Sequence, residues 1–368
     1  MNIIFFQNCL SPHQIPYIKE ICYDNRVEKV YLITPRTDYE MRTAMGWDSR
    51  QLLQGTSIVY YLCPSDEKLK ILLQGKNVVA LFTGIRADKD VFRWFKLSLD
   101  FNVRRGIITE APNLNFWKPI WLHSIRFLIQ DYRYVKRIHY IFAFGELAVQ
   151  YYRLWSAVWN VFPFSYCTDI EIFDMPSDDS FSTRNTKFLF VGTIDKNKNV
   201  GSVLRASKLL KEKNFSFDVI GDGTEKKNLK RYIRQKRITN IIFLGRMSME
   251  DVHGQMQKYD VLILPSRYDG WGAVVNEALQ RGLYVICSDK CGAKDLLEDK
   301  RCGTVFQSGS HKELAQAMQQ CISNIESVRA DRKFRLEWAE RCISGKVIAR
   351  YMVDCLLGKN TGKPWAEI

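Results

Sequence analysis

The sequence predicts an α/β protein built from two doubly wound domains. Short runs that are apolar throughout alternate with segments of helical periodicity, and the alternation occurs in two rounds. Runs without polar alternation are typical of parallel strands that helices cover on both faces. A length of 368 residues allows two domains of ordinary size, each with its own core. We therefore expect two Rossmann-like domains.

The strand-like runs form an N-terminal and a C-terminal set. The N-terminal runs are Ile3–Phe6, Val30–Ile33, Ser57–Leu62, Val78–Phe82, Arg105–Thr109 and Tyr140–Ala143. The C-terminal runs are Phe188–Val191, Phe217–Ile220, Ile241–Leu244, Val261–Leu264 and Tyr284–Ser288. A polar, acidic stretch between them predicts a surface linker. The expected parts are an N-terminal domain over 1–167, a linker over 168–186, a C-terminal domain over 187–343, and a segment over 344–368 with an apolar helical face.

The net charge of +14 favours anionic partners, which include nucleic acid, acidic phospholipid and phosphorylated substrates. Basic and aromatic residues interleave in the first half of the chain. They are Arg93, Trp94, Phe95, Lys96, Arg104, Arg105, Phe116, Trp117, Lys118, Trp121, Arg126, Phe127, Arg133, Tyr134, Lys136 and Arg137. Such a pattern fits a surface that rests on anionic headgroups, and it also fits single-stranded nucleic acid. We expect contact with the inner face of a membrane and no nucleic-acid partner.

The cellular location follows from three features of the sequence. No stretch approaches the ~20 uncharged apolar residues of a spanning helix, and the N-terminus lacks the marks of a signal peptide. The ten cysteines show no zinc-type spacing, and free thiols are typical of a reducing compartment. We therefore expect a cytoplasmic protein that associates peripherally with the inner membrane.

Two short motifs are excluded as cofactor sites. Asp88-Lys89-Asp90 has the spelling of a metal-binding D-x-D, but its setting predicts a helix N-cap and a first-turn acid. Gly221-Asp222-Gly223 follows a strand and precedes a helix, but Lys226 stands where a dinucleotide fingerprint needs its third glycine. We expect neither a metal nor a nicotinamide cofactor.

The stretch from Val261 to Ser288 carries the strongest functional signal. A buried strand is followed by a loop with Gly270 and Gly272, and then by a helix. Ligands of open α/β sheets bind beyond the carboxyl ends of the strands. The glycines allow close approach to a ligand, and the helix N-terminus favours an anion, so we expect a diphosphate site. Asp269 and Glu277, which flank this loop, can accept hydrogen bonds from hydroxyl groups of a sugar and a ribose.

Together with Pro265, Ser266 and Ala278, these residues resemble the signature of the retaining GT-B glycosyltransferases of family 4, P-S-x-x-E-G-x-G followed by E-A. Asp269 stands where most members have Glu, which keeps the charge and shortens the reach. The resemblance implies a GT-B fold, in which two Rossmann-like domains face each other across a cleft. It implies a nucleotide-sugar donor on the C-terminal domain and an acceptor on the N-terminal domain. It also implies that the helix within 344–368 packs back on the N-terminal domain.

Further blocks extend the resemblance over about 188–321. Lys198 matches the lysine that neutralises the donor diphosphate, whereas Thr193 replaces an arginine and Asn199 a glycine. The resemblance makes Asp269, Glu277 and Lys198 the catalytic candidates. The implied donor-binding residues are Gly192, Thr193, Lys198, Gly221, Arg246, Asp269, Gly270, Trp271, Gly272, Ala273 and Glu277.

Two residues of the N-terminal domain are candidates for acceptor contacts. His13 follows the first strand, where it serves either the acceptor or the packing of a helix start. Glu110 ends a strand, where it serves as a base or acceptor contact, or is satisfied by a following helix N-terminus.

The expected function is that of a retaining glycosyltransferase of the hexosyltransferase type. Its donor is a nucleotide sugar, and its acceptor is a lipid-linked saccharide in surface-polysaccharide or glycan assembly. Two alternatives stay open: a GT-B-like sugar-nucleotide epimerase, and a non-catalytic basic protein that binds nucleic acid.

Overall fold

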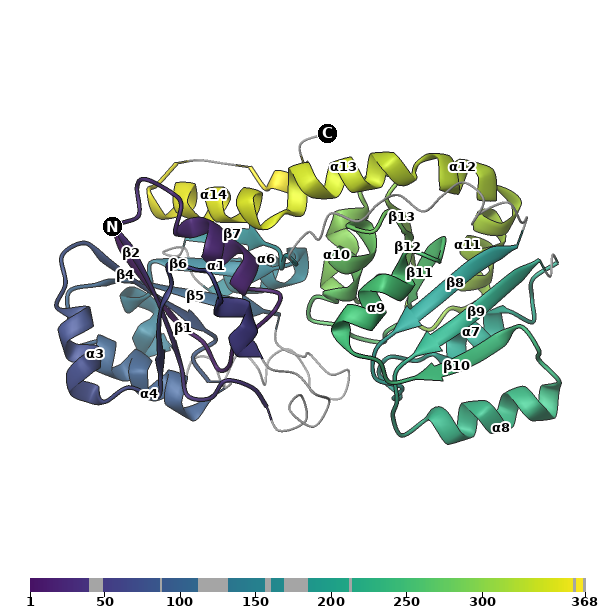
Figure 1. The fold of residues 1–368 in the computed structure, drawn as a ribbon, viewed down its shortest axis with the longest axis horizontal. Helices are drawn as coiled ribbons and strands as arrows, with labels where there is room; N and C mark the ends of the chain where they lie inside the picture. The colour runs from purple at the N-terminus through teal and green to yellow at the C-terminus, as the bar shows by residue number, and fades with distance from the viewer. Residues whose placement is uncertain are drawn as a thin grey trace. The chain divides into compact units, whose positions relative to one another are not determined.

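The chain forms two compact units, each of which is described here by itself (Figure 1). The computed structural model describes residues 1–39, 49–86, 88–111, 132–155, 160–168, 185–211, 214–359 and 362–366. Unit 1 comprises Met1–Asp169 and Ile343–Glu367, and unit 2 comprises Ile170–Cys342. Most of the expected linker, namely residues 169–184, lies outside the described residues.

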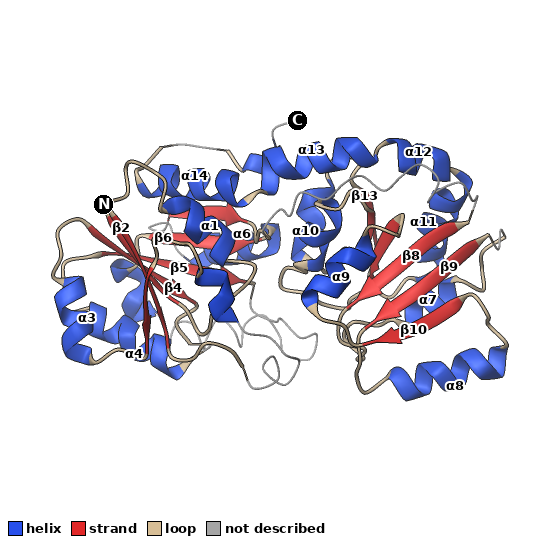
Figure 2. Ribbon diagram, in the orientation of Figure 1, coloured by secondary structure: helices blue, strands red, loops and turns tan. Residues whose placement is uncertain are grey.

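Unit 1 contains a parallel seven-stranded sheet with the order β3-β2-β1-β4-β5-β6-β7 (Figure 2). Its strands are β1 (Asn2–Phe6), β2 (Lys29–Thr34), β3 (Val59–Leu62), β4 (Val78–Thr83), β5 (Arg104–Glu110), β6 (Tyr140–Phe144) and β7 (Asn160–Phe164). Its helices include α1 (Ile15–Ile21), α3 (Asp66–Leu73), α4 (Lys89–Ser98), α6 (Glu146–Trp155) and α14 (Gly345–Leu356), with 3₁₀ turns η1 (Ser49–Leu53), η2 (Tyr132–Arg137) and η5 (Pro364–Ala366). The central strands are buried because helices cover both faces of the sheet.

The core of unit 1 is rich in aromatic rings. Phe6 of β1 stacks on Phe82 of β4 with ring centroids 4.6 Å apart, and Trp94 of α4 lies beside Phe6. Asp88 caps α4, because its carboxylate accepts the amides of Asp90 and Val91. The predicted N-cap is confirmed.

Helix α14 returns to unit 1 and packs against α1 at its start. A Cβ on Gly345 would lie 3.0 Å from the backbone of Pro16, so a larger residue there would require the two helices to move apart slightly. Asp354 of α14 accepts a hydrogen bond of 2.5 Å from Arg26, which follows α1. The last helix of the chain is thereby fixed to the first.

Unit 2 contains a parallel six-stranded sheet with the order β10-β9-β8-β11-β12-β13. Its strands are β8 (Thr186–Val191), β9 (Phe215–Ile220), β10 (Ile241–Gly245), β11 (Val261–Leu264), β12 (Tyr284–Ser288) and β13 (Gly303–Phe306). Its helices are α7 (Gly201–Ala206), α8 (Lys226–Lys236), α9 (Met249–Met256), α10 (Val274–Leu279), η4 (Gly292–Leu297), α11 (His311–Ser323), α12 (Ile325–Ala330) and α13 (Arg332–Ile343). Both sheets follow the doubly wound strand order 3-2-1-4-5-6, and unit 1 adds β7 at one edge.

Two absences hold for the described part of the chain. None of its helices is long and apolar enough to cross a membrane. Within the same residues, no group of three or more His, Cys, Asp and Glu side chains could hold a metal ion.

Candidate functional site

The loops after β8 and β9 meet backbone to backbone at the carboxyl edge of the unit 2 sheet. Gly221 has a φ of +138°, and a Cβ built on it would lie 1.9 Å from the carbonyl oxygen of Gly192. The amide of Gly192 donates to the carbonyl of Ile220 at 3.0 Å. Only glycine fits at position 221, so the two loops form one rigid floor.

The loop after β11 is held in the same way by the loop after β12. The amide of Asp269 donates to the carbonyl of Lys290 at 3.0 Å, and the amide of Gly292 donates to the carbonyl of Asp269 at 3.1 Å. Gly272 has a φ of +95°, and a Cβ there would lie 2.8 Å from Leu264. The glycines of this loop therefore fix the backbone that carries Asp269.

Lys198 and Asp269 form an ion pair at this edge. The ammonium Nζ of Lys198 lies 2.5 Å from Oδ2 of Asp269, and the two side chains are 25% and 15% exposed. Burial lowers the pKa of Lys198, but the charge and hydrogen bond of Asp269, with Cys291 and Asp195 nearby, outweigh burial and raise the pKa. Lys198 is therefore a fixed cation that solvent still reaches.

The loop that carries Lys198 is joined to the loop that carries Asp269. The side-chain amide of Asn197 donates to the backbone carbonyl of Tyr268 at 2.8 Å. The backbone carbonyl of Asn197 accepts the backbone amide of Arg267 at 2.7 Å. Asn199 has a φ of +52°, a left-handed conformation that Asn tolerates better than most residues. This explains why Asn can stand where the resembled family has glycine.

Glu277 lies on α10 and is only 7% exposed. Burial raises the pKa of its carboxyl to about 7, and Arg281 partly opposes this shift. His253 of α9, itself 7% exposed, places Nε2 3.9 Å from Oε2 of Glu277. The sequence analysis missed His253, because a single His in a polar helix carries no functional signal.

The other donor-side candidates differ in their surroundings. Trp271 is 1% exposed and its Nε1 donates to Asn276 at 2.7 Å, so its indole anchors α10 and only its backbone can face a ligand. Arg246 is exposed and its Nε lies 3.9 Å from Asp222. Thr193 is exposed and Ala273 immediately precedes α10.

Unit 1 brings its two acceptor-side candidates together through a third residue. The hydroxyl of Tyr166 donates to Oε1 of Glu110 at 3.0 Å, and the Tyr166 ring lies 5.9 Å from the His13 ring. Tyr166 also stacks on Phe144 at 4.0 Å, and burial, followed by the charge of Glu110, raises its pKa well above the usual value. The sequence analysis missed Tyr166 because it follows β7, a strand that was not predicted.

The prediction of a basic and aromatic surface on the N-terminal domain is wrong for some of its residues. Trp94, Phe95 and Tyr134 are buried in the core of unit 1, and Arg105 is 3% exposed. The sequence pattern mixed core aromatics with surface cations, which composition cannot separate. The expected surface residues Phe116, Trp117, Lys118, Trp121, Arg126 and Phe127 lie outside the described residues.

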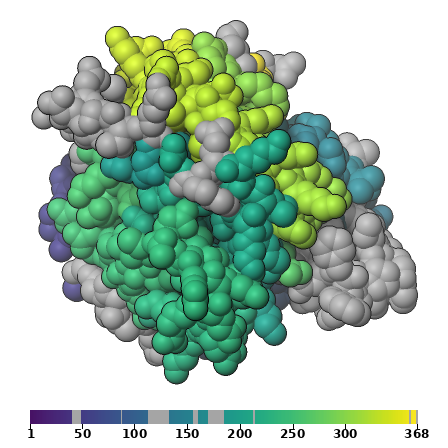
Figure 3. Space-filling model, turned by 90° about the vertical axis from the view of Figure 1, so that its right-hand side faces the viewer, coloured from purple at the N-terminus to yellow at the C-terminus, as the bar shows by residue number. Residues whose placement is uncertain are grey.

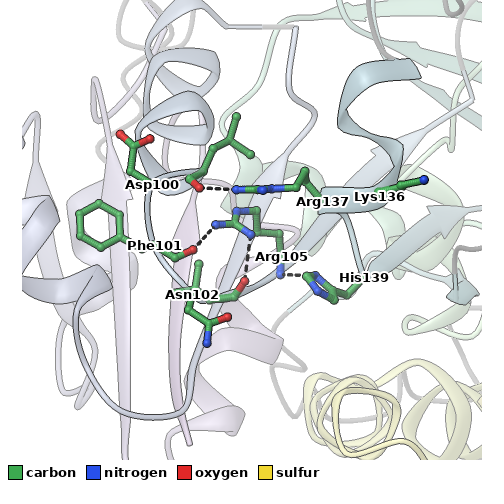
Figure 4. A pocket seen from close by; sticks show the side chains of 9 residues that line it. Asp100, Phe101, Asn102, Arg105, Lys136, Arg137 and His139 are labelled. Carbon is green, nitrogen blue, oxygen red and sulfur yellow. Dashed lines mark hydrogen bonds between the residues drawn. The ribbon is translucent and has the colours of Figure 1, made fainter.

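Arg105 has a structural role, which Figure 4 shows. Its guanidinium donates to the carbonyls of Val103 at 3.0 Å and Phe101 at 2.6 Å, and to that of Ser98 at the end of α4. Burial, followed by the charge of Arg137, lowers the pKa of Arg105 to about 10. Phe101, Val103 and Arg105 also line the adjoining pocket of about 380 Å³. Arg105 therefore caps the C-terminus of α4 and does not belong to a membrane-facing surface.

Two parallel, doubly wound sheets define the fold as α/β of the GT-B class, and solved structures share it. One is HepE of Anabaena in complex with UDP, with a TM-score of 0.73 and 14% identity over 97% of this chain and 100% of that one. Another is the lipopolysaccharide outer core galactosyltransferase WaaB in its apo form, with a TM-score of 0.69 and 14% identity over 97% and 99%. The predicted fold class is confirmed.

Part of the chain is similar in sequence to glycosyltransferases. Residues 174–335, which include Lys198, Asp269 and Glu277, match the family model described as "Glycosyl transferases group 1". One relative is the GalNAc-alpha-(1->4)-GalNAc-alpha-(1->3)-diNAcBac-PP-undecaprenol alpha-1,4-N-acetyl-D-galactosaminyltransferase of Campylobacter jejuni. The two sequences are 31% identical over 243 residues, and this alignment covers 63% of this chain and 60% of that protein. This chain is 28% identical over 163 residues to an uncharacterized glycosyltransferase of Methanocaldococcus jannaschii, or 43% and 45% of the two chains. The chain thus spans about half the length of these curated relatives.

Proposed function

We propose that this protein is a retaining glycosyltransferase that moves a sugar from a nucleoside diphosphate to a lipid-linked saccharide. The observation that carries the proposal is the Lys198–Asp269 pair, 2.5 Å apart, at the glycine-lined carboxyl edge of unit 2. The family match over 174–335 and relatives named as glycosyltransferases support the reaction class. HepE, which shares the fold, was solved with UDP and with UDP-glucose, which supports a nucleotide-sugar donor.

Each residue of the pair has a chemical task in this proposal. When the bond between the anomeric carbon and the diphosphate oxygen breaks, negative charge develops on the leaving group. The ammonium of Lys198 stabilises that charge in a partly desolvated place, where such stabilisation is strongest. Asp269 holds Lys198 in position and can accept hydrogen bonds from the hydroxyls of the donor sugar. No metal is required, because Lys198 supplies the positive charge.

Glu277 has a different task, which is to bind the nucleoside. An ionised carboxylate can accept both hydroxyls of a ribose, and its burial excludes competing water. His13 and Glu110 of unit 1 are proposed to contact the acceptor. The acceptor class rests on the names of two Campylobacter jejuni relatives, both of which act on undecaprenol-linked saccharides. A cytoplasmic location at the inner membrane follows from such an acceptor.

Thermal-shift titration with UDP, GDP, CDP and ADP tests the donor site. We expect one nucleotide to raise the melting temperature of the wild type and of the control Glu250→Ala, whose carboxylate is exposed on α9. The same nucleotide should have no effect on Glu277→Ala. Stabilisation by oligonucleotides and by none of the four nucleotides would contradict the proposal.

Product analysis separates the transferase from an epimerase. Incubation with the nucleotide sugar and a lipid-linked saccharide should release free nucleoside diphosphate and extend the lipid-linked glycan. An epimerase would instead return a nucleotide sugar of altered configuration without any acceptor.

A further inference from the structure

Helix α8 is the most basic element of unit 2. In this helix, which spans Lys226–Lys236, no residue is buried. Leu229, Tyr232 and Ile233 are half-buried and form its inner face, where Leu229 lies close to Gly201 of α7. Figure 1 shows α8 beside the edge strand β10, with no helix outside it. The rest of the helix surface is therefore open to solvent.

Helix α8 and its C-cap residue carry six exposed cations and no carboxylate. They are Lys227, Lys230, Arg231, Arg234, Lys236 and Arg237. Within the described residues, Lys226 pairs with Asp222 at 3.3 Å, and none of the six forms an ion pair. We call these six residues the α8 cationic face. Figure 3 views the side of the molecule on which α8 lies.

The arrangement of these charges is unfavourable for an isolated helix. Lys227 and Arg231 are four positions apart, as are Lys230 and Arg234, and like charges at this spacing repel each other. The helix dipole stabilises the two basic residues of the last turn, Arg234 and Lys236. Anions that approach these residues would relieve the remaining repulsion.

We propose that the α8 cationic face docks unit 2 onto the anionic phospholipids of a membrane. Four of these cations, Lys227, Lys230, Arg231 and Arg234, lie on the side of the helix opposite its half-buried residues and can approach a planar surface together. Each Lys or Arg near an anionic membrane adds to the binding free energy. The surface is distinct from the basic–aromatic one expected on the N-terminal domain. The proposal concerns binding alone and does not depend on the reaction proposed above.

The aromatic residues near α8 argue against single-stranded nucleic acid as the occupant. Stacking of bases needs exposed aromatic rings. Tyr232 is half-buried with Lys208 over its ring at 4.6 Å, and Phe243 of β10 has Lys230 over its ring at 5.8 Å. Both rings are covered by lysines of this chain, so the described residues of this face offer no stacking platform.

The docking is electrostatic rather than insertive. Ile242 and Leu244 of β10 are 52% and 38% exposed, but strand alternation points them away from the side that carries Phe243 and Lys230. No exposed apolar side chain thus accompanies the α8 cationic face in the described residues of α8 and β10. Binding should therefore weaken steeply as salt screens the charges.

Vesicle sedimentation tests the proposal with the whole chain. The probes are vesicles of phosphatidylcholine and vesicles of phosphatidylcholine mixed with phosphatidylglycerol. The variant combines Lys230→Gln, Arg231→Gln and Arg234→Gln. A matched control combines Arg341→Gln, Lys346→Gln and Arg350→Gln, which removes the same charge from exposed positions of α13 and α14.

We expect the wild type to bind only the phosphatidylglycerol vesicles and to be released by salt. The α8 variant should bind at least about tenfold more weakly, because three surface contacts are lost, and the control should bind within about twofold of the wild type. An unchanged melting temperature shows that the variant is folded. Equal binding to both vesicles, or equal losses in both variants, would overturn the proposal. So would an α8 variant that keeps vesicle binding and loses binding to an oligonucleotide.

Discussion

Units 1 and 2 follow the same strand order, yet their carboxyl edges are built from different contacts. In unit 2 the loops touch largely through backbone atoms, because Gly221 lies against Gly192 and Gly292 against Gly270. The Lys198–Asp269 ion pair adds a side-chain contact to them. In unit 1 the loops touch through side chains, because Tyr166 joins Glu110 to His13. Backbone contacts leave little freedom in residue choice, whereas side-chain contacts can change one residue at a time. Under the proposed function, a shared donor chemistry suits the first arrangement and a variable acceptor suits the second.

The candidate carboxylates at the two edges differ in their exposure to solvent. Glu277 is buried on a helix, and burial raises its pKa to about 7. Glu110 is exposed at the end of β5 and accepts a hydrogen bond from Tyr166. Four substitutions test this difference. Three lie at the unit 2 edge and one at the unit 1 edge, and we expect their effects to decrease in that order.

Lys198→Ala should have the largest effect. Loss of a preorganised cation beside the leaving group typically costs about 10²- to 10³-fold in kcat. The control is Lys196→Ala, which removes a neighbouring lysine whose side chain is exposed. Steady-state kinetics with saturating donor measures the difference. Equal activity of the two variants would remove Lys198 from the proposed mechanism.

Gly221→Ala should disrupt the contact between the loops after β8 and β9. Its Cβ would meet the carbonyl oxygen of Gly192 at 1.9 Å, and the φ of +138° is unfavourable for alanine. We expect a loss of about 3 kcal/mol or more in the free energy of unfolding. Gly254→Ala, within α9 and with no atom within 4 Å of its new Cβ, should be neutral or stabilising by up to about 1 kcal/mol. Urea unfolding distinguishes these outcomes, and equal shifts would contradict the described loop contact.

Glu277→Gln should change how stability depends on pH. The folded pKa of about 7 lies above the usual value of 4.5, so the folded state binds the proton more tightly than the unfolded chain. The wild type should therefore lose stability as the pH rises from about 4.5 to about 7, and the variant should not. Above pH 7 the variant should be more stable by roughly 1–3 kcal/mol, and under the proposed function it should bind the nucleotide more weakly. Melting temperatures measured against pH test this, and parallel curves for the two proteins would refute it.

Tyr166→Phe should have the smallest effect and should act on the acceptor alone. The change removes the hydroxyl that donates to Glu110 at 3.0 Å and keeps the ring that stacks on Phe144. We expect the KM for the acceptor to rise about threefold to tenfold, with the KM for the donor unchanged. Tyr132→Phe, at an exposed position, is the control. A change in the donor KM of Tyr166→Phe would show that the two edges are not separate in function.

Most of the fold could be predicted from the sequence because central parallel strands consist of apolar runs. The exception in unit 1 is β7, whose sequence Asn160–Phe164 contains Pro163. Proline cannot donate to a sheet ladder, so a run with proline is a weak strand candidate. The structure places β7 at the edge of the sheet, where proline is tolerated.

The candidate site could be predicted only where its residues lie close in sequence or resemble a known pattern. The loop from Asp269 to Glu277 shows its chemistry in consecutive residues. The pairing of Lys198 with Asp269 joins residues 71 positions apart. The family resemblance named both residues but did not predict that they pair. His253 and Tyr166 have no such pattern, because their roles depend on distances that a sequence does not contain.

The return of α14 to α1 makes the order of synthesis matter for folding. Unit 2 is continuous in sequence, so its residues are all available once Cys342 has been made. Unit 1 waits for Gly345–Leu356, because these residues cover the face of α1 beside Pro16. The N-terminal part of the chain is synthesised first and completed last. A stop codon before residue 345 would leave that apolar face of α1 uncovered.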